Sequence, residues 1–324
     1  MHVDAPGALS PDLLQSTQPV LLRGLVAHWP LVQAARHSEA AFADYLRGFD
    51  AGERLLMWRG APAIGGRFFY NDDFTGFNFE REGHTLGAVL DELLAGTPDA
   101  VYLGSTAIDS AFPALRHDNN LPALAAFKPL VSLWLGNQIR VAPHFDLPDN
   151  IACVVAGRRR FTLFPPDQVA NLYIGPLDLT PAGQPVSLVD PARPDLARFP
   201  RYAEAQRHAQ VFELEPGDAL FLPSQWWHGV ESLDRVSGLV NFWWRQSPPY
   251  MDTPLNTLML ALLTLRDLPP AQRDAWRALF DHYVFDANGD TAAHIPPGAR
   301  GILDPLNEHS ARQLRALLLN RLNR

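Results

Sequence analysis

Between residues 130 and 245 the hydrophobic residues fall in short runs separated by Gly, Pro, Asn and Asp. Runs of this length suit strands buried in a sheet, and the residues between them favour turns. The predicted strands are 131–135, 151–155, 161–164, 211–214, 219–222 and 239–244. Their regular spacing predicts an antiparallel all-β barrel or sandwich. A stretch rich in Pro and Arg, residues 165–210, interrupts the series and is too long for a hairpin loop.

Helical patterns flank this β region on both sides. Apolar residues recur at helical spacing in 38–49 and 84–95, and after residue 252 in helices that start at 253, 269 and 310. The pattern therefore predicts a mainly β fold with flanking helices. Three parts are expected, namely an N-terminal α/β portion (1–128), a β core (129–250, with an insert at about 167–209) and a helical C-terminal region (251–324).

The composition limits the kinds of partner and metal site that the chain can have. The 324 residues carry a net charge of −8, which argues against nucleic acid as a partner because phosphate binding needs a basic surface. Cys153 is the only cysteine, so an internal disulfide, a cysteine zinc site and an iron–sulfur cluster are excluded. Lys128 is the only lysine. Metal chemistry is left to the 11 histidines and the carboxylates.

Neither a signal peptide nor a membrane span is expected. The first residues lack a basic segment followed by an apolar run, and the most apolar stretch, 255–265, is too short to cross a bilayer. We therefore expect a cytoplasmic protein that does not enter a membrane.

One group of residues has the spacing of a metal site. His144 and Asp146 follow the apolar residues 141–143, and side chains two apart on a strand point the same way. His228 opens a later predicted strand and can supply a third ligand. Two histidines and one carboxylate on one face of a metal leave positions open, as in non-haem Fe(II) oxygenases. Each of the three residues could also be an ordinary structural residue when taken singly.

Several further motifs occur in the same order along the β region. They are Pro143-His144-Phe145-Asp146, Asn150, Phe164-Pro165-Pro166-Asp167-Gln168, Arg198-Phe199-Pro200, Pro216-Gly217-Asp218, Trp226-Trp227-His228, Glu231-Ser232-Leu233 and Val240-Asn241-Phe242-Trp243. With them, residues 131–246 resemble the JmjC and cupin-like Fe(II)- and 2-oxoglutarate-dependent oxygenases. Within that family the chain is most similar to the asparaginyl hydroxylase known as factor inhibiting hypoxia-inducible factor.

The resemblance implies a double-stranded β-helix of the jelly-roll type with a metal at its mouth. It assigns His144, Asp146 and His228 to Fe(II). For the co-substrate 2-oxoglutarate it implies that Arg159 stands where the hydroxylase has a lysine that binds the distal carboxylate. Tyr102, Asn150 and Asn241 match further residues around the co-substrate and the iron.

The chain departs from the family at residue 141, where a threonine that helps to hold 2-oxoglutarate is replaced by Val141. A shifted pose of 2-oxoglutarate, or a hydrogen bond from Ser132 or Thr162, would be needed to compensate. Alternation along a strand places Arg158 and Arg160 on the face opposite Arg159.

The resemblance implies hydroxylation of a peptide, a protein side chain or a small molecule, and hydroxylation is favoured over demethylation. Two other readings stay open: a cupin dioxygenase or isomerase that does not use 2-oxoglutarate, and a non-catalytic binding module. We expect residues 68–70, Trp243 and the arginines of the insert to border the entry. Those arginines are Arg193, Arg198, Arg201 and Arg207. The insert could equally be a solvated loop. The C-terminal helices resemble the family's dimerisation element, which predicts a homodimer.

Overall fold

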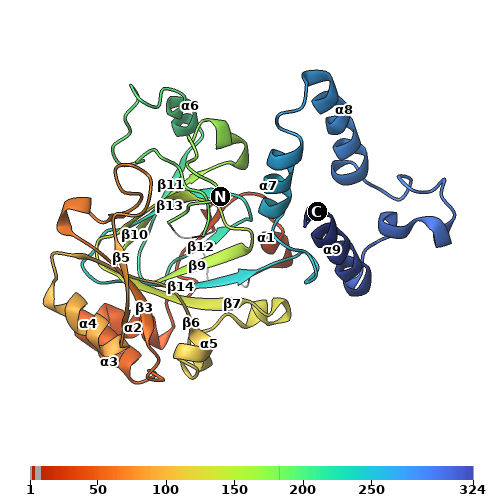
Figure 1. The fold of residues 1–324 in the computed structure, drawn as a ribbon. Helices are drawn as coiled ribbons and strands as arrows, with labels where there is room; N and C mark the ends of the chain where they lie inside the picture. Colours follow the sequence, from red (N-terminus) through yellow and green to blue (C-terminus); the bar gives the residue numbers. More distant parts are fainter. Residues whose placement is uncertain (1, 4–8, 182, 324) are drawn as a thin grey trace. The chain divides into compact units, whose positions relative to one another are not determined.

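The fold was analysed in a computed structural model that describes residues 2–3, 9–181 and 183–323 (Figure 1). The chain separates into two compact units, Met1–Gln246 and Ser247–Arg324. The first unit contains two β-sheets whose strands are mostly antiparallel. Two short pairings, β1 with β2 and β4 with β8, are parallel, which the sequence pattern did not indicate.

The larger sheet has nine strands among the described residues, in the order β1 (His2–Val3), β2 (Val20–Leu22), β12 (Ala219–Leu222), β9 (Asp149–Ala156), β14 (Ser237–Trp244), β7 (Leu130–Gly136), β6 (Ala100–Ala107), β3 (Leu55–Gly60) and β5 (Glu80–His84). The smaller sheet has five, in the order β11 (Gln210–Leu214), β10 (Arg159–Phe164), β13 (Trp227–Ser232), β8 (Arg140–His144) and β4 (Arg67–Phe68). From β7 to β14 the chain passes repeatedly between the two sheets, which gives the predicted jelly roll.

Two layers of apolar side chains account for the continuous hydrophobic runs of the central strands. Every residue of β9 is buried. On one face, Cys153 and Val155 pack with residues of α2 (Pro30–His37), α3 (Glu39–Arg47) and α4 (Leu86–Ala95). On the other, Ala152 and Val154 pack against Phe161 of the smaller sheet. Such strands read as apolar at every position because both of their faces are covered.

The N-terminal portion contributes more strand than its mixed pattern suggests. Its strands β6, β3 and β5 extend the larger sheet, with β5 at the edge. Helix α2 begins at Pro30, which suits the first turn of a helix because proline lacks an N–H group. The short helices α1 (Pro11–Leu14) and α5 (Ile108–Ala111) complete this portion.

The insert between β10 and β11 is folded, which excludes a loop that is solvated throughout. Leu172, Val189 and Tyr202 are buried against Phe164 and Trp227 of the smaller sheet. Tyr202 begins α6 (Tyr202–Arg207). The insert also braces the strand that ends at His144, because the Ser187 N–H donates to the Pro143 carbonyl at 2.7 Å.

The second unit is helical, as expected. It contains α7 (Pro254–Thr264), α8 (Pro270–Phe280), a π-helical turn (Asp281–Phe285) and α9 (Glu308–Leu322). Thr253 caps α7, and Asn307 forms a capping box with Ser310 at the start of α9. Across the described residues, no helix combines the length and hydrophobicity needed to span a membrane.

Candidate metal and anion site

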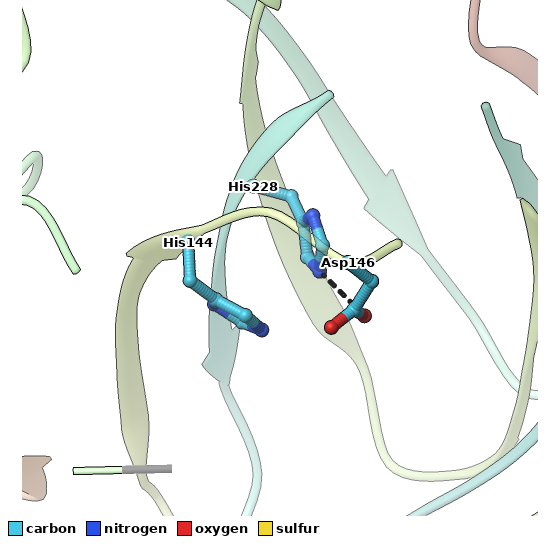
Figure 2. A group of neighbouring side chains, drawn as sticks. All are labelled: His144, Asp146 and His228. Atoms are coloured by element: carbon cyan, nitrogen blue, oxygen red, sulfur yellow. Dashed lines mark ion pairs between the residues drawn. The ribbon is translucent and has the colours of Figure 1, made fainter. Parts of the chain in front are cut away.

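The three predicted metal ligands lie together at one end of the smaller sheet (Figure 2). His144 ends β8, Asp146 follows two residues later, and His228 pairs with His144 across the β8–β13 ladder. One ligand atom from each residue lies within 4.8 Å of the others. His228 Nε2 and Asp146 Oδ2 are 3.6 Å apart. The arrangement fits a divalent metal held by two imidazoles and a carboxylate.

Backbone carbonyls fix which nitrogen each histidine offers. His144 Nδ1 lies 3.0 Å from the Ala142 carbonyl oxygen, and His228 Nδ1 lies 2.9 Å from that of Trp226. A carbonyl only accepts hydrogen bonds, so both Nδ1 atoms carry the proton. Each Nε2 is left with a free lone pair for a metal.

The residues beside the ligands lock the two ligand segments together. Phe145 and Trp227 alternate with the ligands along the chain and therefore point the opposite way, where their rings meet edge to face at 5.0 Å. In addition, the Gln225 N–H donates to the Asp146 carbonyl at 3.0 Å. These contacts hold Asp146 beside the strand that carries His228.

A buried carboxylate supports the same two segments. Asp149 Oδ1 accepts from the Ser224 N–H at 2.9 Å, and Asp149 Oδ2 accepts from Gln246 Nε2 at 2.9 Å. Ser224 also donates through its hydroxyl to the Leu147 carbonyl at 2.6 Å. The loop that follows Asp146 is thereby tied to the turn before His228.

The pKa values of His144 and Asp146 favour the protonation states that bind a metal. Burial, together with the neighbouring His228, lowers the pKa of His144 to about 4, so its imidazole is neutral at pH 7. Burial acts to raise the pKa of Asp146, but the neighbouring His228 and His144 outweigh it and lower the pKa. Asp146 is therefore an ionised carboxylate at pH 7, beside the neutral imidazole of His144.

The triad opens into a cavity of about 100 Å³ between the two sheets. Most of the lining is apolar or aromatic, which is the usual character of a small-molecule site. The lining side chains are Trp58, Tyr102, Trp134, Val141, His144, Asp146, Asn150, Ala152, Arg159, Phe161, Leu222, His228, Val230, Leu239, Asn241 and Trp243.

Arg159 is the only cation among these lining residues, and its side chain is almost fully buried at 2% exposure. Its Nε donates to Ser237 Oγ at 3.0 Å, while its Nη2 is buried without a hydrogen-bond partner. No carboxylate of the described chain forms a salt bridge with it. Burial lowers the pKa of Arg159 to about 10, so the guanidinium is still charged at pH 7. A buried cation of this kind is a binding group for an anion.

The three remaining predicted site residues also face this cavity. Burial raises the pKa of the Tyr102 hydroxyl, so Tyr102 is a neutral donor. Asn241 accepts a hydrogen bond from Trp134, and its Nδ2 lies 3.4 Å from Asn150 Oδ1. The structure therefore brings all seven predicted residues to one cavity, while their roles in binding remain predictions.

Sequence comparison shows the protein family to which the chain belongs. The family description "Cupin-like domain" matches residues 6–250, well over half of the chain. The chain belongs to the cupin-like domain family. The narrower likeness to the asparaginyl hydroxylase stays a prediction.

Curated relatives share the cupin-like region in part. Lysine-specific demethylase JMJ31 of Arabidopsis thaliana is 33% identical over 147 residues, 43% of this chain and 26% of the relative. Human HSPB1-associated protein 1 is 41% identical over 114 residues, 35% of this chain and 23% of the relative. Lysine-specific demethylase 8 of Danio rerio is 27% identical over 242 residues, 72% of this chain and 54% of the relative. The matches thus span from about a quarter to about half of these relatives.

Two expectations about the cupin-like cavity need correction. Thr162 lines a separate small pocket that Val141 also borders, and Ser132 bonds to the Ser105 hydroxyl. Neither residue lines the cavity that contains the metal triad. Strand alternation explains the first result, because Thr162 is an odd number of residues from Arg159. The same alternation turns Arg158 toward Asp234 and Arg160 toward Glu213, as expected.

The expected entry is also only partly present. Trp243 lines the cavity, but residues 68–70 and the arginines Arg193, Arg198, Arg201 and Arg207 do not. Trp58 and Trp134 stand in the wall instead, and sequence reasoning missed both. Their position depends on how β3 and β7 pair with their neighbours, and a run of apolar residues does not reveal that pairing.

Proposed function

We propose that this cupin-like chain is an Fe(II)- and 2-oxoglutarate-dependent oxygenase that hydroxylates a peptide or protein side chain. The observation that carries the proposal is the buried, unpaired Nη2 of Arg159 in the same cavity as the metal triad. A metal with open positions and a separate buried cation suit a co-substrate that chelates at one end and carries a carboxylate at the other.

The strand register supports this pairing of sites. Along β13, His228 lies opposite Leu163 and Ser232 lies opposite Arg159. The two sites are therefore four residues apart, about 13 Å between their backbones at the usual rise per residue. The long Arg159 side chain shortens that gap from within the cavity, which leaves room for a small dicarboxylate rather than a bulky ligand.

The donor set fits Fe(II), and the chain's own groups have definable tasks. Bound at the triad, Fe(II) with 2-oxoglutarate and O₂ supplies the oxidant that converts a substrate C–H bond to C–OH, with release of succinate and CO₂. Arg159 and the Tyr102 hydroxyl bind the distal carboxylate, while Trp58 and Trp243 exclude water from the cavity wall. His144 and His228 bind through Nε2, in the tautomers set by their backbone partners.

Hydroxylation is preferred to demethylation on the resemblance to an asparaginyl hydroxylase, although some relatives are named lysine-specific demethylases. A small-molecule substrate is the second candidate. A cupin enzyme that works without 2-oxoglutarate has no use for a buried, unpaired arginine. A binding module that had lost catalysis would not need three preserved ligands.

The test is formation of succinate from 2-oxoglutarate by the purified chain with added Fe(II). We expect iron-dependent turnover that His144→Ala abolishes. Arg160→Met should leave it intact, because Arg160 is a partly exposed arginine next to Arg159 on β10 and does not line the cavity. Because many such reactions run slowly without substrate, uncoupled turnover is sufficient. No succinate with or without candidate peptides would overturn the proposal.

We further propose that the second unit forms a homodimer. Of its described residues only Ala292 and Ala311 are buried, so the unit has almost no core of its own. A groove of about 270 Å³ between α7 and α8 is lined by apolar side chains including Leu262, Trp276 and Phe280. The exposed leucines of α9 from a second copy have the apolar character needed to pack into this groove. Light scattering that shows a monomer would refute this.

A further inference from the structure

Three side chains on neighbouring strands form a hydrogen-bonded row along the cavity wall. Trp134 on β7 donates through Nε1 to Asn241 Oδ1 on β14 at 2.7 Å. Asn241 Nδ2 in turn lies 3.4 Å from Asn150 Oδ1 on β9. The register makes them diagonal neighbours on one face, since Asn241 lies opposite Ser132 and Asn150 lies opposite Trp243.

The direction of this row follows from the chemistry of the indole. An amide can be turned end for end, but an indole N–H is only a donor. The Asn241 atom that faces Trp134 must therefore be oxygen, and its NH₂ group must face Asn150. The Asn150 atom that faces Asn241 must then be oxygen as well. The Asn150 NH₂ group is left directed away from the row.

Among the described residues, that NH₂ group is the unpaired end of the row. Asn150 is 6% exposed and lines the cavity, and in the part of the chain that is described no acceptor is bonded to its Nδ2. We propose that Trp134 is a positioning residue, which sets the two amides so that Asn150 offers a donor to an anionic oxygen of the ligand. The inference rests on the proposed function, which makes that ligand 2-oxoglutarate.

Trp134 is itself held in place by aromatic contacts on both sides. Its ring is stacked with Tyr102 at 5.9 Å between centroids, and it meets Trp243 edge to face at 5.6 Å. Both neighbours line the same cavity. Because the ring is fixed, its N–H points in one direction. The hydrogen bonds of the row therefore run from Trp134 through Asn241 to Asn150 and not the other way.

The experiment is a double-mutant cycle on 2-oxoglutarate binding, measured by calorimetry without oxygen and with Mn(II) in place of iron. Asn150→Ala removes the final donor, and Trp134→Phe removes the indole N–H but keeps an aromatic ring. We expect about 10-fold weaker binding for Asn150→Ala and about 5-fold for Trp134→Phe, since each costs one charge-assisted hydrogen bond in whole or in part. The double variant should bind no more weakly than Asn150→Ala alone.

Trp58→Phe is the matched control, because Trp58 lines the same cavity but takes no part in the row. Its effect should multiply with that of Asn150→Ala. If the Trp134→Phe and Asn150→Ala effects also multiply, Trp134 acts by packing alone and the positioning role is wrong, while the proposed function stands. If the wild-type chain with Mn(II) binds no 2-oxoglutarate, the proposed function and the positioning role both fail.

Discussion

Replacing Arg159 by methionine should make the ligand-free protein more stable. The side chain is 2% exposed, its Nη2 has no partner, and burial lowers its pKa well below the usual value for arginine, to about 10. A shift of that size corresponds to roughly 3 kcal/mol against the charged form in the folded state. Methionine of similar length fills the space without a charge.

The gain is partly offset, because Ser237 Oγ loses the hydrogen bond from Arg159, at about 1 kcal/mol. The net expectation is a free energy of unfolding higher by about 2 kcal/mol and a Tm higher by about 4 °C. The pH dependence has a definite sign. The folded-state pKa is depressed, so the penalty is fully present below pH 10 and fades as the pH rises from there toward the pKa of the unfolded chain.

Urea unfolding of the ligand-free protein at pH 7.5 measures the effect. Arg160→Met is the matched control, because Arg160 lies next along β10 but is partly exposed and paired with Glu213 and Glu231. It should lower stability slightly, whereas Arg159→Met raises it. The stabilised variant should also lose the increase in Tm that Mn(II) with 2-oxoglutarate gives to the wild type. A less stable Arg159→Met protein would refute the reasoning, because the guanidinium would then be satisfied within the fold.

Three further outcomes are expected. His228→Ala should abolish the increase in Tm caused by Mn(II) alone, whereas the exposed His117→Ala should retain it, as measured by differential scanning fluorimetry. Asp149→Ala should lower the free energy of unfolding by about 1–3 kcal/mol, because it leaves the Ser224 N–H unpaired. It should also weaken Mn(II) binding at least several-fold, as measured by calorimetry. Unchanged Mn(II) affinity would show that this carboxylate does not position the metal ligands. Leu318→Glu on α9 should convert a dimer to a monomer in light scattering, with succinate formation taken as the readout of whether the dimer matters for turnover.

The sequence predicts best those helices and strands whose hydrophobic pattern directly reflects which of their faces are buried. The buried strands β9 and β14 read as largely apolar runs because both faces are covered, and the helices of the second unit show regular spacing. Strand β5 (Glu80–His84) was missed for the opposite reason. It is a polar edge strand, so its pairing with β3 has no hydrophobic signature.

The insert shows a different limit. Leu172, Val189 and Tyr202 are scattered among prolines and arginines, so no window of the insert has the period of a helix or strand. They are buried only because Phe164 and Trp227 present a matching apolar surface from the smaller sheet. That surface exists after the barrel has formed, and no local window contains it.

Arg159 shows which features of the site can be predicted from the sequence and which depend on the assembled fold. Alternation along one strand is enough to turn Arg159 inward and its two neighbouring arginines outward, and the structure agrees. Whether the inward arginine meets a carboxylate depends on what the other strands around the cavity present to it. Those strands supply Tyr102, Ser237 and apolar groups, and the only cavity carboxylate, Asp146, belongs to the metal triad. The missing counter-charge is therefore a property of the assembled barrel, and it is the feature on which the proposed binding of a ligand with its own negative charge depends.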